Sequence, residues 1–378
     1  MGMAGFDVSK EWVILSPSDI PHAIRGVEEL SRCIGLLAGN TGKPKPPVVS
    51  AVSGSLPPET APVIILNSDN SGPERNGFVW RAGKERIEIF GESERGLCNG
   101  IFSFLAALGI SWPAPGQEKL PSPQADNPGS FPFLNIAAVG GTASGSGAAG
   151  NEGYSVCKPS HFHGKNPTAA PWRRFVLAGN REIRAALKKS EAFAAWAGRN
   201  CYDAVIFPLA VFGSAKSGKK LMQLKQFAGE YGITLEAGGW DLSSFVPRKY
   251  FLLNRDSFRM EGGRRENKHH FCPTSLGAIR IMGTEGKKLF QAAAEVDVFH
   301  LWPDKGAETM WCSCPTCRAF TPQEQNRMGV NAAADVLASV NPRAFITCYE
   351  KPGEAGKIPL KKNVFRIDEY PEEAKTIE

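Results

Sequence analysis

The sequence has no long apolar run and no block of like charge, and we expect no secretory leader. No stretch approaches the roughly 20 apolar residues that a bilayer-spanning helix needs, so we expect no membrane span. The N-terminal residues Met1–Asp7 do not show the basic-then-apolar layout of a signal peptide. The 44 Lys and Arg and the 38 Asp and Glu residues are spread along the chain, with no run longer than pairs such as Arg264–Arg265. We therefore expect no nucleic-acid partner.

The sequence also lacks a regular cysteine framework. Its 9 cysteines are odd in number and irregularly spaced, and Cys314-Pro-Thr-Cys317 has no second Cys-x-x-Cys to match it. A small disulfide-stapled fold is therefore excluded, and free thiols, a metal knuckle or isolated bridges remain.

What is present is the composition of a folded, mixed protein. The chain has 378 residues, of which 42% are hydrophobic and 22% charged, which excludes wholesale disorder and a coiled-coil rod. Its 40 Gly and 28 Pro indicate many turns and loops. A chain of this length predicts two or three domains.

The first part of the chain predicts a small α/β domain. Strand patterns occupy residues 11–15, 63–66, 77–81 and 86–90, and helical periodicity covers residues 20–37 and 97–108. Between Pro113 and Pro132 the composition turns to Pro, Gly, Gln and Ser, as in a linker. We therefore predict one domain over residues 1–130 and a second over 131–378.

The second part alternates apolar runs with amphipathic segments. Strand candidates are residues 133–139, 204–209, 233–237, 296–302, 344–349 and 363–367, and helix candidates are 181–198, 221–231, 286–294 and 325–340. This rhythm favours a (β/α) barrel of the TIM type. Because such a barrel has eight strands and about 250 residues, we expect this one to be incomplete at the C-terminus.

Two stretches resemble known glycoside hydrolases. The first runs from Gly77-Phe-Val-Trp80 through Arg86-Ile-Glu-Ile-Phe90 to Trp112-Pro113, and it is similar to the small α/β domain before the barrel of family 20 hexosaminidases and of α-glucuronidases. The second runs from Pro247-Arg-Lys-Tyr-Phe251 to Trp311-Cys-Ser-Cys-Pro-Thr-Cys317. It resembles the bacterial domain-of-unknown-function family 4838, which includes endo-β-N-acetylglucosaminidases of glycoside hydrolase family 163.

Glycoside hydrolysis needs an acid and a second group that stabilises or attacks the sugar cation. Barrel enzymes carry such groups at the carboxyl ends of their strands, and Asp304 and Glu350 follow two of the predicted strands. The hexosaminidase resemblance implies two neighbouring catalytic carboxyls in one loop. Glu308 lies in the same loop as Asp304 and is therefore a further candidate for the acid. The alternative for each is a carboxylate that caps a helix or faces solvent.

Aromatic side chains near the predicted strand ends are candidate sugar-binding walls, because the C–H faces of sugars stack on flat rings. They are Trp240, Trp302, Trp311 and Tyr349. His300 lies inside an apolar strand, either as a hydrogen-bonded core histidine or as a substrate contact. The alternative for the aromatics is packing in the core.

Cys312, Cys314 and Cys317 have the tight spacing of a zinc knuckle, with His300, Cys272 or Cys348 to complete a tetrahedron. The alternative is a set of free or disulfide-linked cysteines. No organic cofactor is expected.

The resemblance implies a hydrolase that cleaves β-linked N-acetylhexosamine in a glycan, in substrate-assisted fashion, with Asp304 at the acetamido group and Glu350 or Glu308 as the acid. It also implies an extracytoplasmic protein. Two rivals remain: a non-catalytic glycan-binding homologue, favoured by departures from the family pattern at Gly239-Trp240 and Trp302-Pro303, and a zinc-stabilised interaction protein.

Overall fold

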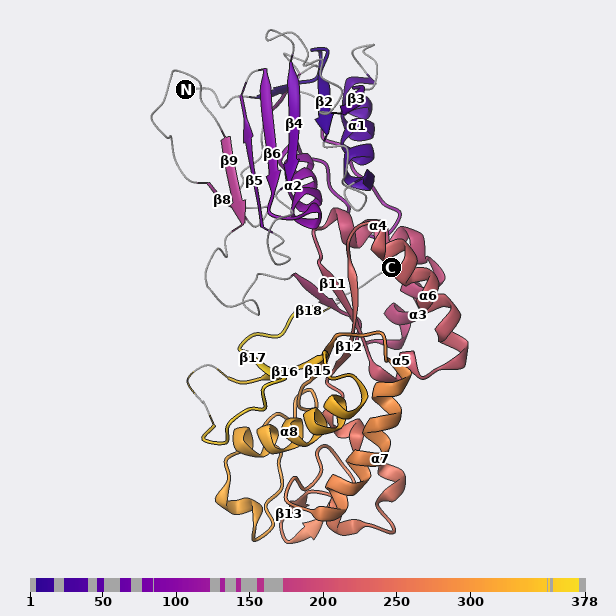
Figure 1. Ribbon diagram of the computed structural model, residues 1–378, viewed down its shortest axis with the longest axis vertical. Coiled ribbons are helices and arrows are strands. Elements are labelled where there is room, and N and C mark those ends of the chain that lie inside the picture. Colours follow the sequence, from indigo (N-terminus) through magenta and orange to yellow (C-terminus); the bar gives the residue numbers. More distant parts are fainter. Residues whose placement is uncertain are drawn as a thin grey trace.

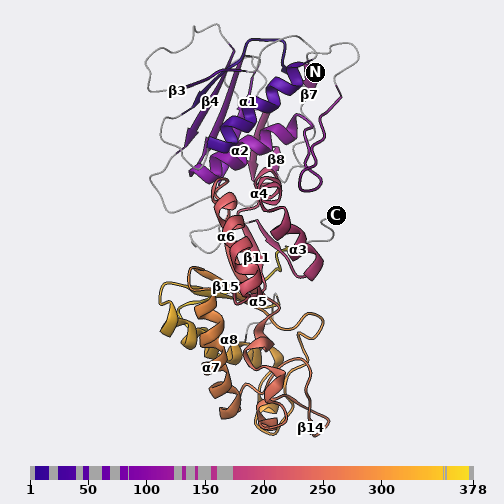
Figure 2. The same ribbon diagram turned by 90° about the vertical axis from the view of Figure 1, so that its right-hand side faces the viewer.

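The computed structural model describes residues 5–16, 24–39, 46–50, 62–68, 77–83, 85–122, 130–132, 141–143, 155–159, 173–351, 353 and 356–373. These residues form an N-terminal α/β layer and a barrel-like unit, stacked along the long axis of the molecule (Figures 1 and 2). Within the described ranges, no helix is both long and apolar enough to cross a membrane.

The N-terminal layer is a seven-stranded sheet covered by two helices. In spatial order its strands are β3 (Val48–Ser50), β2 (Val13–Ser16), β4 (Val63–Ser68), β6 (Arg86–Gly91), β5 (Phe78–Ala82), β9 (Ser155–Pro159) and β8 (Gly141–Ala143). Helices α1 (Ile24–Ala38) and α2 (Glu94–Ala107) lie on one face of the sheet (Figure 2). A short pair, β1 (Gly5–Asp7) with β7 (Ser130–Pro132), lies beside it. The predicted elements of this layer are confirmed.

Strands β8 and β9 follow residue 130, yet β9 pairs with β5 of the first sheet. The N-terminal sheet therefore draws on residues beyond the predicted boundary. The division into two domains at that residue stays a prediction.

The barrel-like unit is a parallel sheet in which chain order and spatial order agree. Its strands are β10 (Arg174–Val176), β11 (Ala204–Phe207), β12 (Thr234–Gly239), β15 (Val298–Leu301), β16 (Phe345–Tyr349) and β17 (Val364–Ile367), with β18 (Glu372–Glu373) on the other side of β10. Its helices are α3 (Asn180–Lys188), α4 (Ser190–Arg199), α5 (Leu209–Phe212), α6 (Ala215–Gly229), α7 (Leu276–Ala292) and α8 (Pro322–Val340). A hairpin of β13 (Met260–Glu261) and β14 (Arg264–Arg265) lies in the loop between β12 and α7.

This sheet is curled. The chain passes from Ile367 at one edge to Glu372 at the opposite edge within five residues, which span at most about 17 Å. A flat seven-stranded sheet with strands about 4.8 Å apart would hold its edges roughly 29 Å apart. The predicted barrel is therefore confirmed.

One expected strand of the barrel cannot be compared with the structure, and one expected helix is divided. The expected first strand, 133–139, lies outside the described residues, and β10 begins the sheet instead. The expected helix 181–198 is two helices, α3 and α4, which meet at Lys189 with a non-helical backbone of φ −115° and ψ 48°.

A buried arginine is among the side chains that join the N-terminal layer to the amino ends of the barrel strands. Arg95 of α2 is 6% exposed and donates to the carbonyl oxygens of Tyr202 and Tyr231, the latter over 2.7 Å. Its Nε atom lies 3.4 Å from Oδ1 of Asp203, directly before β11. These contacts of Arg95 lie at the amino ends of the strands, opposite their carboxyl ends.

Candidate functional site

Four aromatic side chains meet where the barrel strands end. Trp240 follows β12, Trp302 follows β15, Tyr349 ends β16 and Tyr370 follows β17. Tyr370 stacks on Tyr349 with ring centroids 3.9 Å apart, and it lies 5.2 Å from Trp302 and 5.6 Å from Trp240. Trp240 meets Trp302 edge to face at 5.1 Å. We call these four residues the aromatic mouth.

The glycines before Trp240 are required by the close approach of two strands. Gly238 has φ +114°, and a Cβ atom there would lie 2.0 Å from the carbonyl oxygen of His300. Gly239 has φ +123°, a conformation that other residues rarely adopt. The Gly-Gly pair thus allows β12 to lie against β15 and to turn Trp240 toward Trp302.

Three polar atoms in and beside the mouth are buried without a hydrogen-bond partner in the described part of the chain. They are Nε1 of Trp240, the hydroxyl of Tyr370 and Oδ1 of Asp304. The Nζ atom of Lys305 lies 5.0 Å from the centre of the Trp240 ring. Because buried polar groups are nearly always paired, these three atoms require a partner such as a water molecule or a bound ligand.

Asp304 lies in the loop after β15, at a strand end as predicted. Its Oδ2 atom is 3.9 Å from Nη2 of Arg248. A second carboxyl, Asp241, follows the neighbouring strand β12 and accepts the backbone N–H of Leu209 over 2.9 Å. Burial raises the pKa of Asp241, and the negative charge of Asp304 raises it further. Asp241 is therefore a further carboxyl at a strand end, one that was not singled out from the sequence.

Glu308 lies in the same loop as Asp304. Its Oε1 atom accepts the backbone N–H of Gly306 over 2.9 Å. Burial raises the pKa of Tyr370, and the charge of Glu308 contributes to the rise. Asp304 and Glu308 thus both belong to the loop that follows Trp302.

Glu350 is held elsewhere. Its side chain is 1% exposed, and both of its carboxylate oxygens accept hydrogen bonds from Arg327 of α8, one of them over 2.7 Å. Arg327 also donates to the carbonyl oxygens of Gly356 and Ile358. The role of Glu350 as the acid stays a prediction, and this pairing argues against it.

His300 lies inside the barrel in a polar network. Its Nε2 atom is 2.7 Å from Oε2 of Glu236, and its Nδ1 atom is 2.6 Å from the hydroxyl of Thr347. Arg174 donates to both oxygens of Glu236, over 2.6 and 3.2 Å. Burial works to raise the pKa of Glu236, but the charges of Arg174 and His300 hold it below its usual value. Burial lowers the pKa of His300, although the charge of Glu236 works in the opposite direction.

A cavity of about 270 Å³ connects this network with the mouth. It is lined by Arg173, Arg174, His300, Ile367, Glu369, Tyr370 and Pro371. Tyr370 lines this cavity and is also part of the aromatic mouth. His300 therefore lines the same cavity as one of the four mouth residues.

Trp311 lies apart from the mouth, 6% exposed. Its ring stacks on His270 with centroids 4.1 Å apart and meets Phe271 edge to face at 6.0 Å. Its Nε1 atom donates to the carbonyl oxygen of Glu308 over 3.1 Å. These contacts give Trp311 a packing role, the alternative stated for it above.

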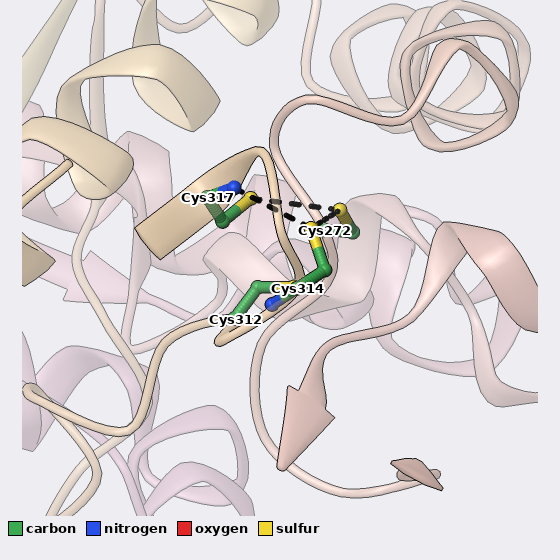
Figure 3. Close-up of side chains that lie close together, drawn as sticks. All are labelled: Cys272, Cys312, Cys314 and Cys317. Carbon is green, nitrogen blue, oxygen red and sulfur yellow. Dashed lines mark hydrogen bonds between the residues drawn. The ribbon is translucent and has the colours of Figure 1, made fainter. Parts of the chain in front are cut away.

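The cysteines of the predicted knuckle form a cluster with Cys272, from the loop after β12 (Figure 3). The Sγ atoms of Cys272, Cys312, Cys314 and Cys317 all lie within 4.8 Å of one another, and all four residues are buried. This group can hold a metal ion. Of the open choices for the fourth ligand, His300 bonds Glu236 and Cys348 bonds Asn326, and neither belongs to the cluster.

Comparisons with known proteins identify structures of similar fold. No protein-family model matches the chain, and no curated protein sequence does. The chitobiase of Flavobacterium johnsoniae is similar in structure, with 13% identity and a TM-score of 0.51 over 96% of this chain and 52% of that one. The β-N-acetylhexosaminidase of Bacteroides fragilis has 14% identity and a TM-score of 0.47, over 97% of this chain and 67% of that one. The family 20 exo-β-N-acetylglucosaminidase of Vibrio harveyi has 12% identity and a TM-score of 0.47, over 97% and 55%.

The chitobiase match confirms the hexosaminidase-like fold that the resemblance implied. The chain spans between about half and two thirds of the length of these structures. Membership of family 4838 stays a prediction, because no family model matches.

Proposed function

We propose that the protein is a glycoside hydrolase that acts on β-linked N-acetylhexosamine in glycans. The observation that carries the proposal is the aromatic mouth with its unpaired buried atoms, Nε1 of Trp240, the Tyr370 hydroxyl and Oδ1 of Asp304. Sugars offer both apolar C–H faces for the rings and hydroxyl groups for these atoms. The fold shared with a chitobiase supports the substrate class.

In the proposed reaction, Asp304 orients and polarises the acetamido group, so that its carbonyl oxygen attacks the anomeric carbon. Glu308 donates a proton to the departing glycosidic oxygen. Water then opens the cyclic intermediate, and the proton lost from the water returns to Glu308. Asp241, at the end of the neighbouring strand β12, is a second carboxyl whose pKa is raised by burial and by the charge of Asp304. The pair has different environments, as carboxyls with separate roles require.

The proposal involves no organic cofactor. Zinc, the metal favoured by the spacing of Cys312, Cys314 and Cys317, stays a proposal for the cysteine cluster and takes no part in the reaction. An extracytoplasmic location likewise stays a proposal, drawn from the resemblance alone.

The experiment is hydrolysis of chromogenic β-N-acetylglucosaminide and β-glucoside by the full chain. Because the acetamido oxygen is the proposed nucleophile, only the first substrate should be cleaved. N-glycans with internal β-N-acetylglucosamine extend the comparison to larger substrates. Equal cleavage of both chromogenic sugars would reject substrate assistance.

A second candidate is a glycan-binding protein without hydrolase activity. It is favoured by Glu350, whose carboxylate is held by Arg327, and by Asp241, which accepts the N–H of Leu209. In this case the same glycans bind at the mouth and are recovered uncleaved. Calorimetry followed by mass spectrometry of the glycan distinguishes the two candidates.

A further inference from the structure

We infer that Cys272, Cys312, Cys314 and Cys317 form a closed zinc site that ties the loop after β12 to the loop after β15. Cys272 belongs to the first loop, and the other three cysteines belong to the second. Four thiolates fill a tetrahedral zinc completely and leave no position for water, so the ion is structural.

The sulfur geometry fits this ion. Zn–S bonds of about 2.3 Å in a tetrahedron place sulfur atoms about 3.8 Å apart. Sγ of Cys272 lies 3.8 Å from Sγ of Cys314 and 3.7 Å from Sγ of Cys317 (Figure 3). None of the four forms a disulfide.

The surroundings supply the N–H donors that thiolates at a metal centre receive. The backbone N–H of Met260 donates to Sγ of Cys312 over 3.3 Å, and that of Cys317 donates to Sγ of Cys314 over 3.5 Å. Nη1 of Arg265, on β14, lies 3.8 Å from Sγ of Cys312. Such outer contacts orient metal ligands, and a positive charge offsets part of the charge of four thiolates.

The ion would act on the Asp304 loop through two side chains next to its ligands. His270, two residues before Cys272, has Nε2 2.9 Å from the carbonyl oxygen of Ala307. Trp311, directly before Cys312, stacks on His270 and donates to the carbonyl oxygen of Glu308. Fixing Cys272 to Cys312 therefore fixes the ring pair that holds residues 307 and 308. The inference concerns the fold of this loop and stands whether or not the protein is a hydrolase.

The test is metal analysis of the full chain purified without chelator, under reducing conditions. We expect one zinc per chain and four thiols that react with a thiol reagent only after the zinc is removed. Cys272→Ser should lower the zinc content at least tenfold, whereas Cys348→Ser, a buried cysteine outside the cluster, should retain it. Iron in place of zinc, or four thiols that react at once in the untreated chain, would overturn the assignment.

Hydrogen exchange of the wild-type chain before and after chelation tests whether the zinc restrains the loop after β15. This measurement does not depend on the folding of a variant. We expect amide exchange in residues 304–312 to rise at least tenfold when zinc is removed, and exchange in α1 to stay unchanged. Zinc loss without any change in residues 304–312 would overturn the proposed link between the metal and this loop.

Discussion

Arg327 binds Glu350 through two nitrogen atoms in the interior of the protein, with Nη2 2.7 Å from Oε2. The Arg327 side chain is 10% exposed and the Glu350 side chain 1%. Truncating one partner leaves the other as a buried, uncompensated charge. We expect Glu350→Ala to lower the free energy of unfolding by about 3 kcal/mol or more, measured by urea unfolding.

Asp335→Ala is the matched control for this pair, because Asp335 forms an exposed ion pair with Lys361 and its loss should cost less than about 1 kcal/mol. If Glu350→Gln kept full stability and lost all hydrolysis, Glu350 would be the acid after all.

Trp240 supplies a wall of the aromatic mouth and an unpaired Nε1 donor. We expect Trp240→Ala to weaken glycan binding about tenfold, or ~1.4 kcal/mol, and Trp240→Phe to recover part of the loss by restoring a flat ring. Calorimetric titration measures both. Phe365→Ala is the control, because Phe365 packs on Phe345 and is not part of the mouth. Equal effects of Trp240→Ala and Phe365→Ala would argue against sugar stacking.

The burial of His300 predicts that the free energy of unfolding depends on pH. Burial lowers its pKa from 6.5 in the folded chain, so below about pH 6.5 the unfolded chain binds a proton that the folded chain does not. The contribution of this histidine is therefore fully present above pH 6.5. It falls by up to about 1.4 kcal/mol per pH unit as the pH drops toward the folded pKa.

Urea unfolding of wild type and His300→Gln between pH 7.5 and about 5 isolates this contribution, because other groups titrate in both proteins. The wild type should lose stability more steeply below pH 6.5. Parallel curves over the whole range would show that burial does not lower the pKa of His300 in the folded chain.

The Tyr370 hydroxyl is buried without a partner in the described residues, so it adds no protein hydrogen bond to stability. We expect Tyr370→Phe to leave the free energy of unfolding equal or raise it by about 1 kcal/mol, while glycan affinity falls severalfold. Thermal unfolding and calorimetry give the two values. A clear loss of stability with unchanged affinity would show that the hydroxyl bonds the protein and not the ligand.

The barrel could be predicted because its buried parallel strands are continuous apolar runs, as in Ala204–Phe207 and Val298–Leu301. Strand β10, Arg174–Val176, was missed because it is three residues long and begins with an arginine whose charge is satisfied by Glu236, which is distant in sequence. Local patterns do not show such a partner.

The candidate site could be predicted only in part from the sequence. Strand-end position identifies Asp304 and Trp240, and the same rule applied to the residue after Trp240 would have found Asp241. It could not show that Arg327, 23 residues before Glu350, would bind that carboxylate. Tyr370 lies beyond the last predicted strand, and only the closing of the sheet brings it to Trp302. Cys272 lies 42 residues before Cys314 and 45 before Cys317, so spacing alone could not choose it over His300 or Cys348 as the fourth ligand.

The central claim is that Asp304 serves glycan hydrolysis at the aromatic mouth. Its most direct test is the kcat for a chromogenic β-N-acetylglucosaminide, compared among wild type, Asp304→Asn and the surface control Asp335→Asn. We predict turnover by wild type and Asp335→Asn, and a loss of about 10²-fold or more in Asp304→Asn at unchanged stability. Turnover by Asp304→Asn at the wild-type rate, or no turnover by any of the three proteins, would contradict the account.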